Sequence, residues 1–344
     1  MRHPMLLLLL AYLAFVSLGL PDTALGVAWP SLRRHFDLPA SAIATVLTAG
    51  MAGYFTSGLL AGKLMQALGV GGVLALSCGF VTAALTVYAL APAWWFFFPG
   101  GLLMGIGSGA IDAGLNGYAA RHFSVKHVNW LHACWGIGAS VGPALMTGAI
   151  ARGNGYTAGY GLLALALGGM TVAFAWTHRL WNEPAGEVRT ARSTEAQADA
   201  AVQAHAEVSA AGDGPRVTMF AALRSGPVWL HIVAFFLYTG FEASTGQWCF
   251  TLLTAGRGLS VERAGFWTSC YWGSLTLGRV LLGFVVDRFG PDRLLRYATT
   301  SAALGAAAWA LDPGLVGRLG LLLVGLSLAP IFPTLMARTP ARLG

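Results

Sequence analysis

Residues 73–91 read VLALSCGFVTAALTVYALA, a run without a single charged side chain. A helix of about 20 such residues is about 30 Å long, which is the thickness of the hydrocarbon core of a bilayer. The whole chain shares this character, since 56% of its 344 residues are hydrophobic and only 10% are charged. Soluble globular proteins carry roughly 25% charged residues. The composition therefore excludes a soluble protein and indicates one that crosses the membrane several times.

About ten apolar stretches have the length that a membrane-crossing helix needs. The first follows Met1, Arg2 and His3 as the apolar core of a signal peptide would, but its apolar character continues beyond Asp22. We therefore interpret it as the first membrane helix and predict an all-helical polytopic protein. The predicted spans are Leu6–Trp29, Ser41–Leu68, Val73–Ala91, Trp95–Tyr118, Asn129–Ala151, Tyr156–Trp181, Pro227–Leu253, Arg263–Val286, Arg293–Leu311 and Leu315–Leu335.

A polar segment, Asn182–Gly226, separates the sixth span from the seventh and is rich in Ala, Glu and Gln. Its composition is typical of a solvated linker. We expect an N-terminal six-helix bundle at 1–181, a cytoplasmic linker at 182–226 and a C-terminal bundle at 227–344. Lys and Arg lie mostly in the loops on the same side as the N-terminus, which indicates that this side faces the cytoplasm. We expect the membrane to be a bacterial inner membrane.

The two halves of the chain repeat each other at an offset of about 220 residues. Asp22 and Gly26 coincide with Glu242 and Gly246, the segment 62–69 coincides with 283–290, and Gly105 coincides with Gly325. Such matches indicate two similar bundles related by an axis along the membrane normal. The second half then lacks two of an expected twelve helices. Either the protein has ten spans or its end is missing, and we expect a missing end, because an unmatched half exposes polar faces to lipid.

The segment 283–293, GFVVDRFGPDR, resembles the cytoplasmic loop motif of the major facilitator superfamily. The resemblance implies a two-bundle transporter that works by alternating access. A tight glycine turn with an acid and bases can latch helix ends together, and we expect that role for this loop. The first-half copy carries Gln66 and Ala67 in place of the acid and base. The expected gating residues are Gly283, Asp287, Arg288, Gly290 and Arg293.

Four further segments resemble the fucose-permease-like family within that superfamily. These are 19–30, 105–116, 129–143 and 240–248. The family implies uptake of a sugar or a similar small solute together with a proton, and its important acids on the first and fourth helices match Asp22 and Asp112. The fourth-helix acid is a glutamate in the fucose permease and an aspartate here, so the identity of the substrate does not carry over.

Three acidic residues, Asp22, Asp112 and Glu242, lie deep within predicted spans. Charges inside a membrane are costly, so each of them needs a reason. We predict that they carry protons, because removal from water favours the neutral, protonated carboxyl. The alternative is a structural carboxylate that is bonded to backbone or to a buried base. For Arg279, two turns into its span from the cytoplasmic side, we expect a structural role, in which it reaches the membrane surface or pairs with Asp287.

The predicted substrate contacts surround these acids. Asn116 shares a helix face with Asp112, and aromatic rings follow Glu242 in sequence and on the next span. Aromatic faces can stack on a sugar ring, although plain packing is an alternative for each of them. The candidates are Asn116, His132, Tyr238, Trp248, Trp267, Tyr271 and Trp272.

The sequence thus predicts a proton-coupled symporter of a small polar solute. Alternatives are a proton-driven exporter of drugs or metabolites and, less favoured, a non-transporting membrane receptor. We find no metal-ligand cluster, nucleophile–base pair or phosphate loop, so we predict no enzyme activity and no cofactor. The expected partners are the solute, protons and the lipid bilayer, with no nucleic acid, and we expect a monomer.

Overall fold

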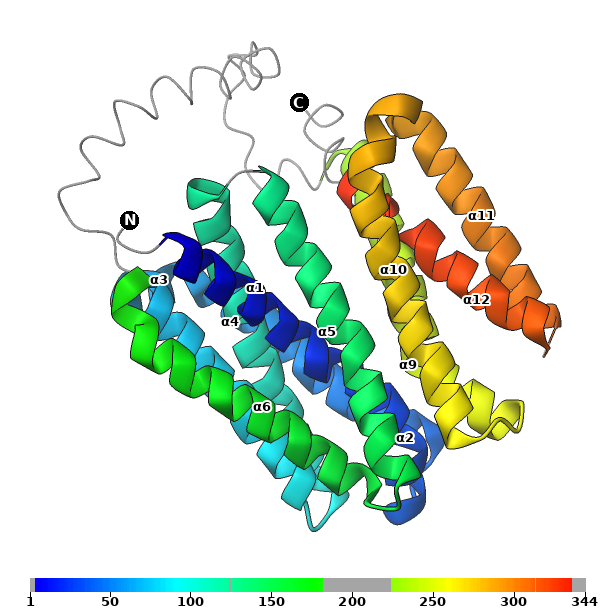
Figure 1. Cartoon of the computed structure of the whole chain (residues 1–344), viewed down its shortest axis with the longest axis horizontal. Coiled ribbons are helices and arrows are strands. Elements are labelled where there is room, and N and C mark those ends of the chain that lie inside the picture. Colours follow the sequence, from blue (N-terminus) through cyan, green and yellow to red (C-terminus); the bar gives the residue numbers. More distant parts are fainter. Residues whose placement is uncertain (1–3, 124, 182–223, 313, 336–344) are drawn as a thin grey trace.

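The computed structural model describes residues 4–123, 125–181, 224–312 and 314–335. Helices make up nearly all of this part of the chain, and Figure 1 shows them in two groups. The predicted all-helical, two-bundle architecture is confirmed. The predicted linker lies almost wholly outside the described residues, so the three domain boundaries remain predictions.

The first group contains the helices of the first half, and each predicted span has a counterpart among them. The first span is divided into two helices, and the second and third are joined in one long helix with a break. These helices are α1 (Pro4–Asp22), α2 (Ala24–His35), α3 (Ile43–Leu90), α4 (Phe97–His122), α5 (Val125–Ala151) and α6 (Gly155–Thr177). Short 3₁₀ turns at Ala40–Ala42, Trp94–Phe96 and His178–Trp181 precede or follow them.

The second group contains the four remaining predicted spans. Its helices are α9 (Gly226–Thr251), α10 (Val261–Phe289), α11 (Pro291–Leu311) and α12 (Leu315–Leu328). A π-helical turn, Leu252–Gly256, extends α9. By length and apolar composition alone, six described segments could cross a membrane, and one of them, the 51-residue stretch Ala40–Leu90, holds two predicted spans. Large apolar side chains such as Leu165, Trp176 and Phe236 are exposed on the outside of the bundles, where lipid would cover them.

The break in α3 and the turn after α10 confirm the internal repeat. Gly69 has φ 68° and ψ 167°, and its predicted counterpart Gly290 has φ 70° and ψ 156°. Only glycine adopts this conformation without strain. A second matched pair sets the spacing of helices: a Cβ on Gly105 would lie 1.9 Å from the carbonyl oxygen of Gly50, and one on Gly325 would lie 2.6 Å from that of Tyr271. The halves therefore repeat in packing as well as in sequence.

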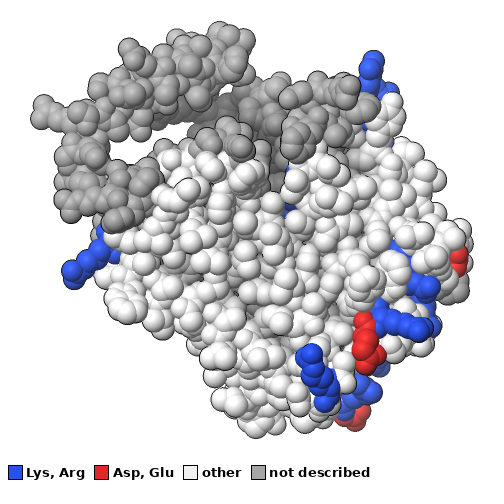
Figure 2. All heavy atoms as spheres, in the orientation of Figure 1, with Lys and Arg blue, Asp and Glu red and all other residues white. Residues whose placement is uncertain are grey.

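The two halves meet where α5 lies along α10 and α2 touches α9 (Figure 1). Small residues permit this approach, since Gly136 of α5 lies against Thr276 of α10 and Gly265 of α10 lies against Thr147 of α5. The face drawn in Figure 2 carries most of its charged side chains toward the margins, and its middle is almost entirely uncharged. That distribution is the one expected of a surface in contact with lipid.

Candidate functional site

Asp22 lies at a break between two helices. The helix α1 ends at this residue, α2 begins at Ala24, and the intervening Thr23 donates its hydroxyl hydrogen to the carbonyl oxygen of Ala139 on α5 at 2.9 Å. Pro21 lies in the last turn of α1 and has no backbone N–H, so it cannot make the usual helical hydrogen bond, which weakens the helix where it ends. Gly19 and Pro21 lie within the first span and predict an interruption beside Asp22, which the structure confirms. Asp22 is exposed at that point.

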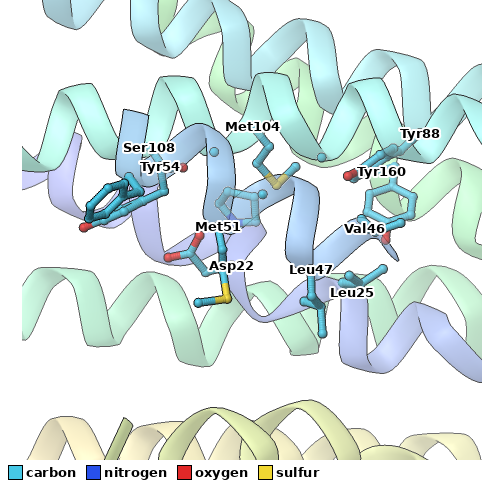
Figure 3. A pocket seen from close by; sticks show the side chains of 15 residues that line it. Asp22, Leu25, Val46, Leu47, Met51, Tyr54, Tyr88, Met104, Ser108 and Tyr160 are labelled. Atoms are coloured by element: carbon cyan, nitrogen blue, oxygen red, sulfur yellow. The ribbon is translucent and has the colours of Figure 1, made fainter. Parts of the chain in front are cut away.

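A cavity of about 350 Å³ opens beside Asp22, and every residue that lines it belongs to the first half. Figure 3 shows Asp22 and Met51 in its middle, with Tyr54 toward one end and Tyr88 and Tyr160 toward the other. Among the described residues that line it, Asp22 is the only one with a charged side chain. The lining residues are Pro21, Asp22, Leu25, Val46, Leu47, Gly50, Met51, Tyr54, Phe55, Tyr88, Gly101, Met104, Gly105, Ser108 and Tyr160.

Asp112 on α4 accepts hydrogen bonds at both of its carboxylate oxygens. The hydroxyl of Tyr54 donates to Oδ2 at 2.6 Å, and Nδ2 of Asn116 donates to Oδ1 at 2.9 Å. The shared helix face of Asp112 and Asn116 is as predicted. Tyr54 was not predicted, because it comes from α3 and no sequence spacing joins it to Asp112. Since Tyr54 also lines the cavity, it connects Asp112 to the space beside Asp22.

Glu242 on α9 has three neighbours from its own half. The hydroxyl of Tyr238, one turn earlier, donates to its carboxylate, and the hydroxyl of Tyr271 donates to its backbone oxygen at 3.0 Å. A guanidinium nitrogen of Arg279 lies 3.6 Å from its Oε1. We expected Arg279 to reach the membrane surface or Asp287, but the structure places its guanidinium inside, beside Glu242. The side chain of Asp287 lies outside the described residues.

Trp135 of α5 joins the acids of the two halves, and the sequence did not single it out. Its Nε1 donates to Oδ2 of Asp22 at 3.2 Å. The guanidinium carbon of Arg279 lies 5.1 Å from the centre of its ring system, within the range of a cation–π contact. Trp272 meets the same ring edge-on at 5.9 Å. One indole therefore contacts an acid of the first half and a base of the second.

The structure brings some of the other predicted substrate residues close to these acids. Trp272 is buried against Gly246, and Tyr271 is buried with its hydroxyl already bonded to Glu242. His132 is half-buried with its ring edge-on to Phe15 at 5.3 Å. These positions suit residues that support the site, and substrate contact remains a prediction for each of them.

Two predicted aromatic contacts differ in their surroundings. Trp248 is 37% exposed, whereas Trp267 lies beneath the guanidinium of Arg318 at 5.6 Å from the ring centre. Arg318 belongs to α12, so this contact of Trp267 lies within the second half. Neither arrangement tests the predicted stacking on a solute.

The predicted gating loop is described only in its backbone and at its end. Gly290 ends α10 with its left-handed conformation, and Arg293 is exposed in the first turn of α11. The side chains of Asp287 and Arg288 are not described, and neither are the contacts of Gly283. The latch therefore remains a prediction. Within the described residues, no group of three or more His, Cys, Asp or Glu is placed to hold a metal ion.

Comparison of the amino-acid sequence with known proteins identifies a family and two relatives. The family model described as Major Facilitator Superfamily matches residues 11–343. Bypass of stop codon protein 6 of Saccharomyces cerevisiae is 26% identical over 288 residues, which are 80% of this chain and 56% of that protein. The glucose/mannose transporter GlcP of Bacillus subtilis is 21% identical over 330 residues, 94% of this chain and 77% of that protein. The chain thus spans little more than half the length of the yeast relative.

Solved transporter structures share the fold. The D-xylose-proton symporter superposes with a TM-score of 0.67 at 16% identity, covering 94% of this chain and 79% of that one. The fucose:proton symporter FucP of E. coli gives 0.60 at 17% identity, covering 98% and 84%. The nucleoside transporter NupG gives 0.68 at 16%, covering 94% and 80%. At such identities the likeness shows the fold and leaves the solute open.

Proposed function

The chain belongs to the Major Facilitator Superfamily, and from this premise we propose that it takes up a small, sugar-like solute together with protons. Membership makes it a multi-pass membrane transporter of small solutes and not an enzyme. The observation that carries the proposal is the setting of the acids. Asp22 and Asp112 lie inside the first bundle, and no Lys or Arg forms an ion pair with either of them among the described side chains.

A carboxyl group in this setting can carry a proton through a transport cycle. The neutral form is favoured where water is scarce, so a proton taken up on one side can be held while the bundles rock about their shared contacts. Asp22 faces an open cavity, and among the described residues its carboxylate has a single donor, Trp135, which leaves room for a proton or a solute hydroxyl. When the cavity faces the opposite side, rehydration favours release.

A sugar-like solute is supported by the donors and acceptors around the cavity and by the relatives. Asp22, Tyr54 and Ser108 offer polar atoms to hydroxyl groups, and apolar side chains line the rest of the wall. The printed names of similar proteins refer to glucose and mannose, to D-xylose and to fucose. We propose one of these sugar classes as the first to test.

Transport is tested in reconstituted vesicles with labelled glucose, mannose, xylose and fucose under an imposed pH gradient, acidic outside. We expect accumulation that an ionophore collapsing the gradient abolishes, and none in Asp22→Asn or Asp112→Asn. The matched control is Glu262→Gln, an exposed acid in the first turn of α10. Hydrogen bonds from its own backbone amide and from Ser260 lower the pKa of Glu262, so it stays ionised. Unchanged accumulation in both aspartate variants contradicts the proton role.

Proton-driven export of amphipathic compounds is the second candidate, and the apolar wall of the cavity favours it. Leu25, Leu47, Met51, Phe55 and Met104 together offer an apolar surface beside a single acid. An exporter predicts greater sensitivity to such compounds in a strain that lacks the gene. An importer predicts failed growth on one carbon source and unchanged sensitivity.

We further propose that the protein lies in a bacterial inner membrane with its N-terminus on the cytoplasmic side, and that it works as a monomer. The excess of Lys and Arg on that side supports the orientation. Labelling of Lys63 in intact cells and in inverted vesicles tests it. We expect labelling only in inverted vesicles, and labelling only in intact cells contradicts the orientation.

A further inference from the structure

Four side chains form a continuous line from one half of the molecule to the other. The line runs from Asp22 on α1 to Trp135 on α5, then to Arg279 on α10 and Glu242 on α9. We propose that Trp135 and Arg279 are positioning residues that link Asp22 to Glu242 across the interface between the halves. The inference rests on the proposed proton coupling, to which it adds the route by which one half senses the acid of the other.

The first contact holds the indole in place. The Trp135 side chain can donate a hydrogen bond only through Nε1, and this group donates to Oδ2 of Asp22 at 3.2 Å. A hydrogen bond to a charged acceptor is stronger than one to a neutral acceptor. The orientation of the indole is therefore tied more firmly to Asp22 when that acid is ionised than when it carries a proton.

The second contact crosses the interface. Arg279 belongs to the second half, and its guanidinium carbon lies 5.1 Å from the Trp135 ring centre and one of its nitrogens 3.6 Å from Glu242. Ring and carboxylate thus attract the same cation. When Glu242 takes up a proton, the attraction on its side falls and the balance moves toward the ring. Only 19% of the Arg279 side chain is exposed, which keeps these attractions less screened by water than they would be at the surface.

Tight packing next to this contact makes it a defined geometry. Gly136 directly follows Trp135, and a Cβ there would lie 2.1 Å from the hydroxyl of Thr276, so α5 and α10 touch at that level. Trp272 adds an edge-on ring contact from the same face of α10, seven residues before Arg279. A change in the tilt of α10 against α5 must therefore alter the Trp135–Arg279 contact.

The internal repeat shows that the two ends of this line are equivalent residues. Asp22 and Glu242 occupy equivalent positions in the two halves, since the offset of about 220 residues superimposes them. Trp135 and Arg279 are not equivalent to each other, because one lies on α5 and the other on α10. An asymmetric pair thus connects two symmetric acids. Such a link lets the protonation of one acid bias the position of the other half.

Fluorine NMR of the full chain, labelled with fluorotryptophan and held in lipid nanodiscs at one pH, tests the link without a known solute. The chain has 12 tryptophans, and the resonance that Trp135→Phe removes belongs to Trp135. We expect Asp22→Asn to shift it, and Glu242→Gln to shift it as well although no contact joins Glu242 directly to that ring. In an Arg279→Gln background, the Glu242→Gln shift should vanish. Arg279→Lys, which keeps the charge, should restore part of it.

The resonance of Trp176, 86% exposed on the outside of α6, is the internal control and should stay in place in every variant. If Glu242→Gln leaves the Trp135 resonance unmoved, or moves it equally without Arg279, the link is wrong. Failure of the vesicle assay together with an intact NMR link overturns the proposed transport and leaves the contact route standing. The reverse result overturns the inference alone.

Discussion

At the level of single residues, each acid of the candidate site is held by donors from its own helix, from other helices, or from both. Tyr54 and Asn116 serve Asp112, Trp135 serves Asp22, and Tyr238 with Arg279 serves Glu242. The acids themselves could be predicted, because a charge in an apolar span stands out in any sequence. Tyr54, Trp135 and the partner of Arg279 could not, because aromatic residues abound in membrane helices and no spacing links residues on different helices.

The Tyr54 hydroxyl is predicted to hold Asp112 in place. Tyr54→Phe keeps the ring in the cavity and removes the donor to Oδ2, and loss of a hydrogen bond to a charged group costs about 1.5–3 kcal/mol. We expect a lower rate of pH-driven accumulation with the protein still folded, as measured in vesicles. Tyr160→Phe is the control, since that buried hydroxyl of the same cavity has no partner among the described residues. Equal effects of the two changes would contradict the role.

At the level of helices, the sequence predicted which segments are helical better than where they break. Each of the ten segments identified by length and apolar composition is helical, and the repeat identified Gly69 and Gly290 as matched positions. Gly19 and Pro21 predicted the break in the first span, but one detail escaped prediction. The second and third spans run on through Gly69 with little loop between them. This continuity depends on backbone angles that packing against neighbouring helices decides.

The spacing between α3 and α4 depends on one glycine. In Gly105→Ala the new methyl group would meet the backbone of Gly50, and overpacking of this kind costs about 1–3 kcal/mol. We expect a lower unfolding temperature in detergent. Gly117→Ala on the same helix is the matched control, because nothing lies within 4 Å of its Cβ, and it should be neutral or stabilising by about 0.5–1 kcal/mol. A Gly105→Ala protein as stable as the control would show that the helices are farther apart than described.

At the level of the whole molecule, the two halves are packed firmly within themselves and touch along few helices. The contacts of α5 with α10 and of α2 with α9 join them, which suits two bodies that rock against each other. The fold could be predicted from the repeat and the loop motif. The cavity could not, because it is lined by the first half alone, whereas a two-bundle architecture predicts a site between the bundles.

Rocking between the halves is tested by tying them together. A Cβ on Gly273 of α10 would lie 3.7 Å from the hydroxyl oxygen of Ser140 on α5, so Ser140→Cys with Gly273→Cys can form a disulfide. In a chain freed of its native cysteines, we expect oxidation to stop transport and reductant to restore it. Thr82→Cys with Thr171→Cys, whose hydroxyls lie 3.1 Å apart within the first half, is the control and should leave transport intact. Transport through the Ser140–Gly273 cross-link would contradict rocking along this contact.

Proton movement driven by the solute is the most direct measurement of the central claim. Vesicles holding the purified chain and a trapped pH-sensitive dye, without an imposed gradient, receive each candidate sugar from outside. We predict that the transported sugar acidifies the vesicle interior, and that Asp22→Asn and Asp112→Asn abolish this signal while Glu262→Gln preserves it. Sugar entry without any change of internal pH in the native protein would contradict the account.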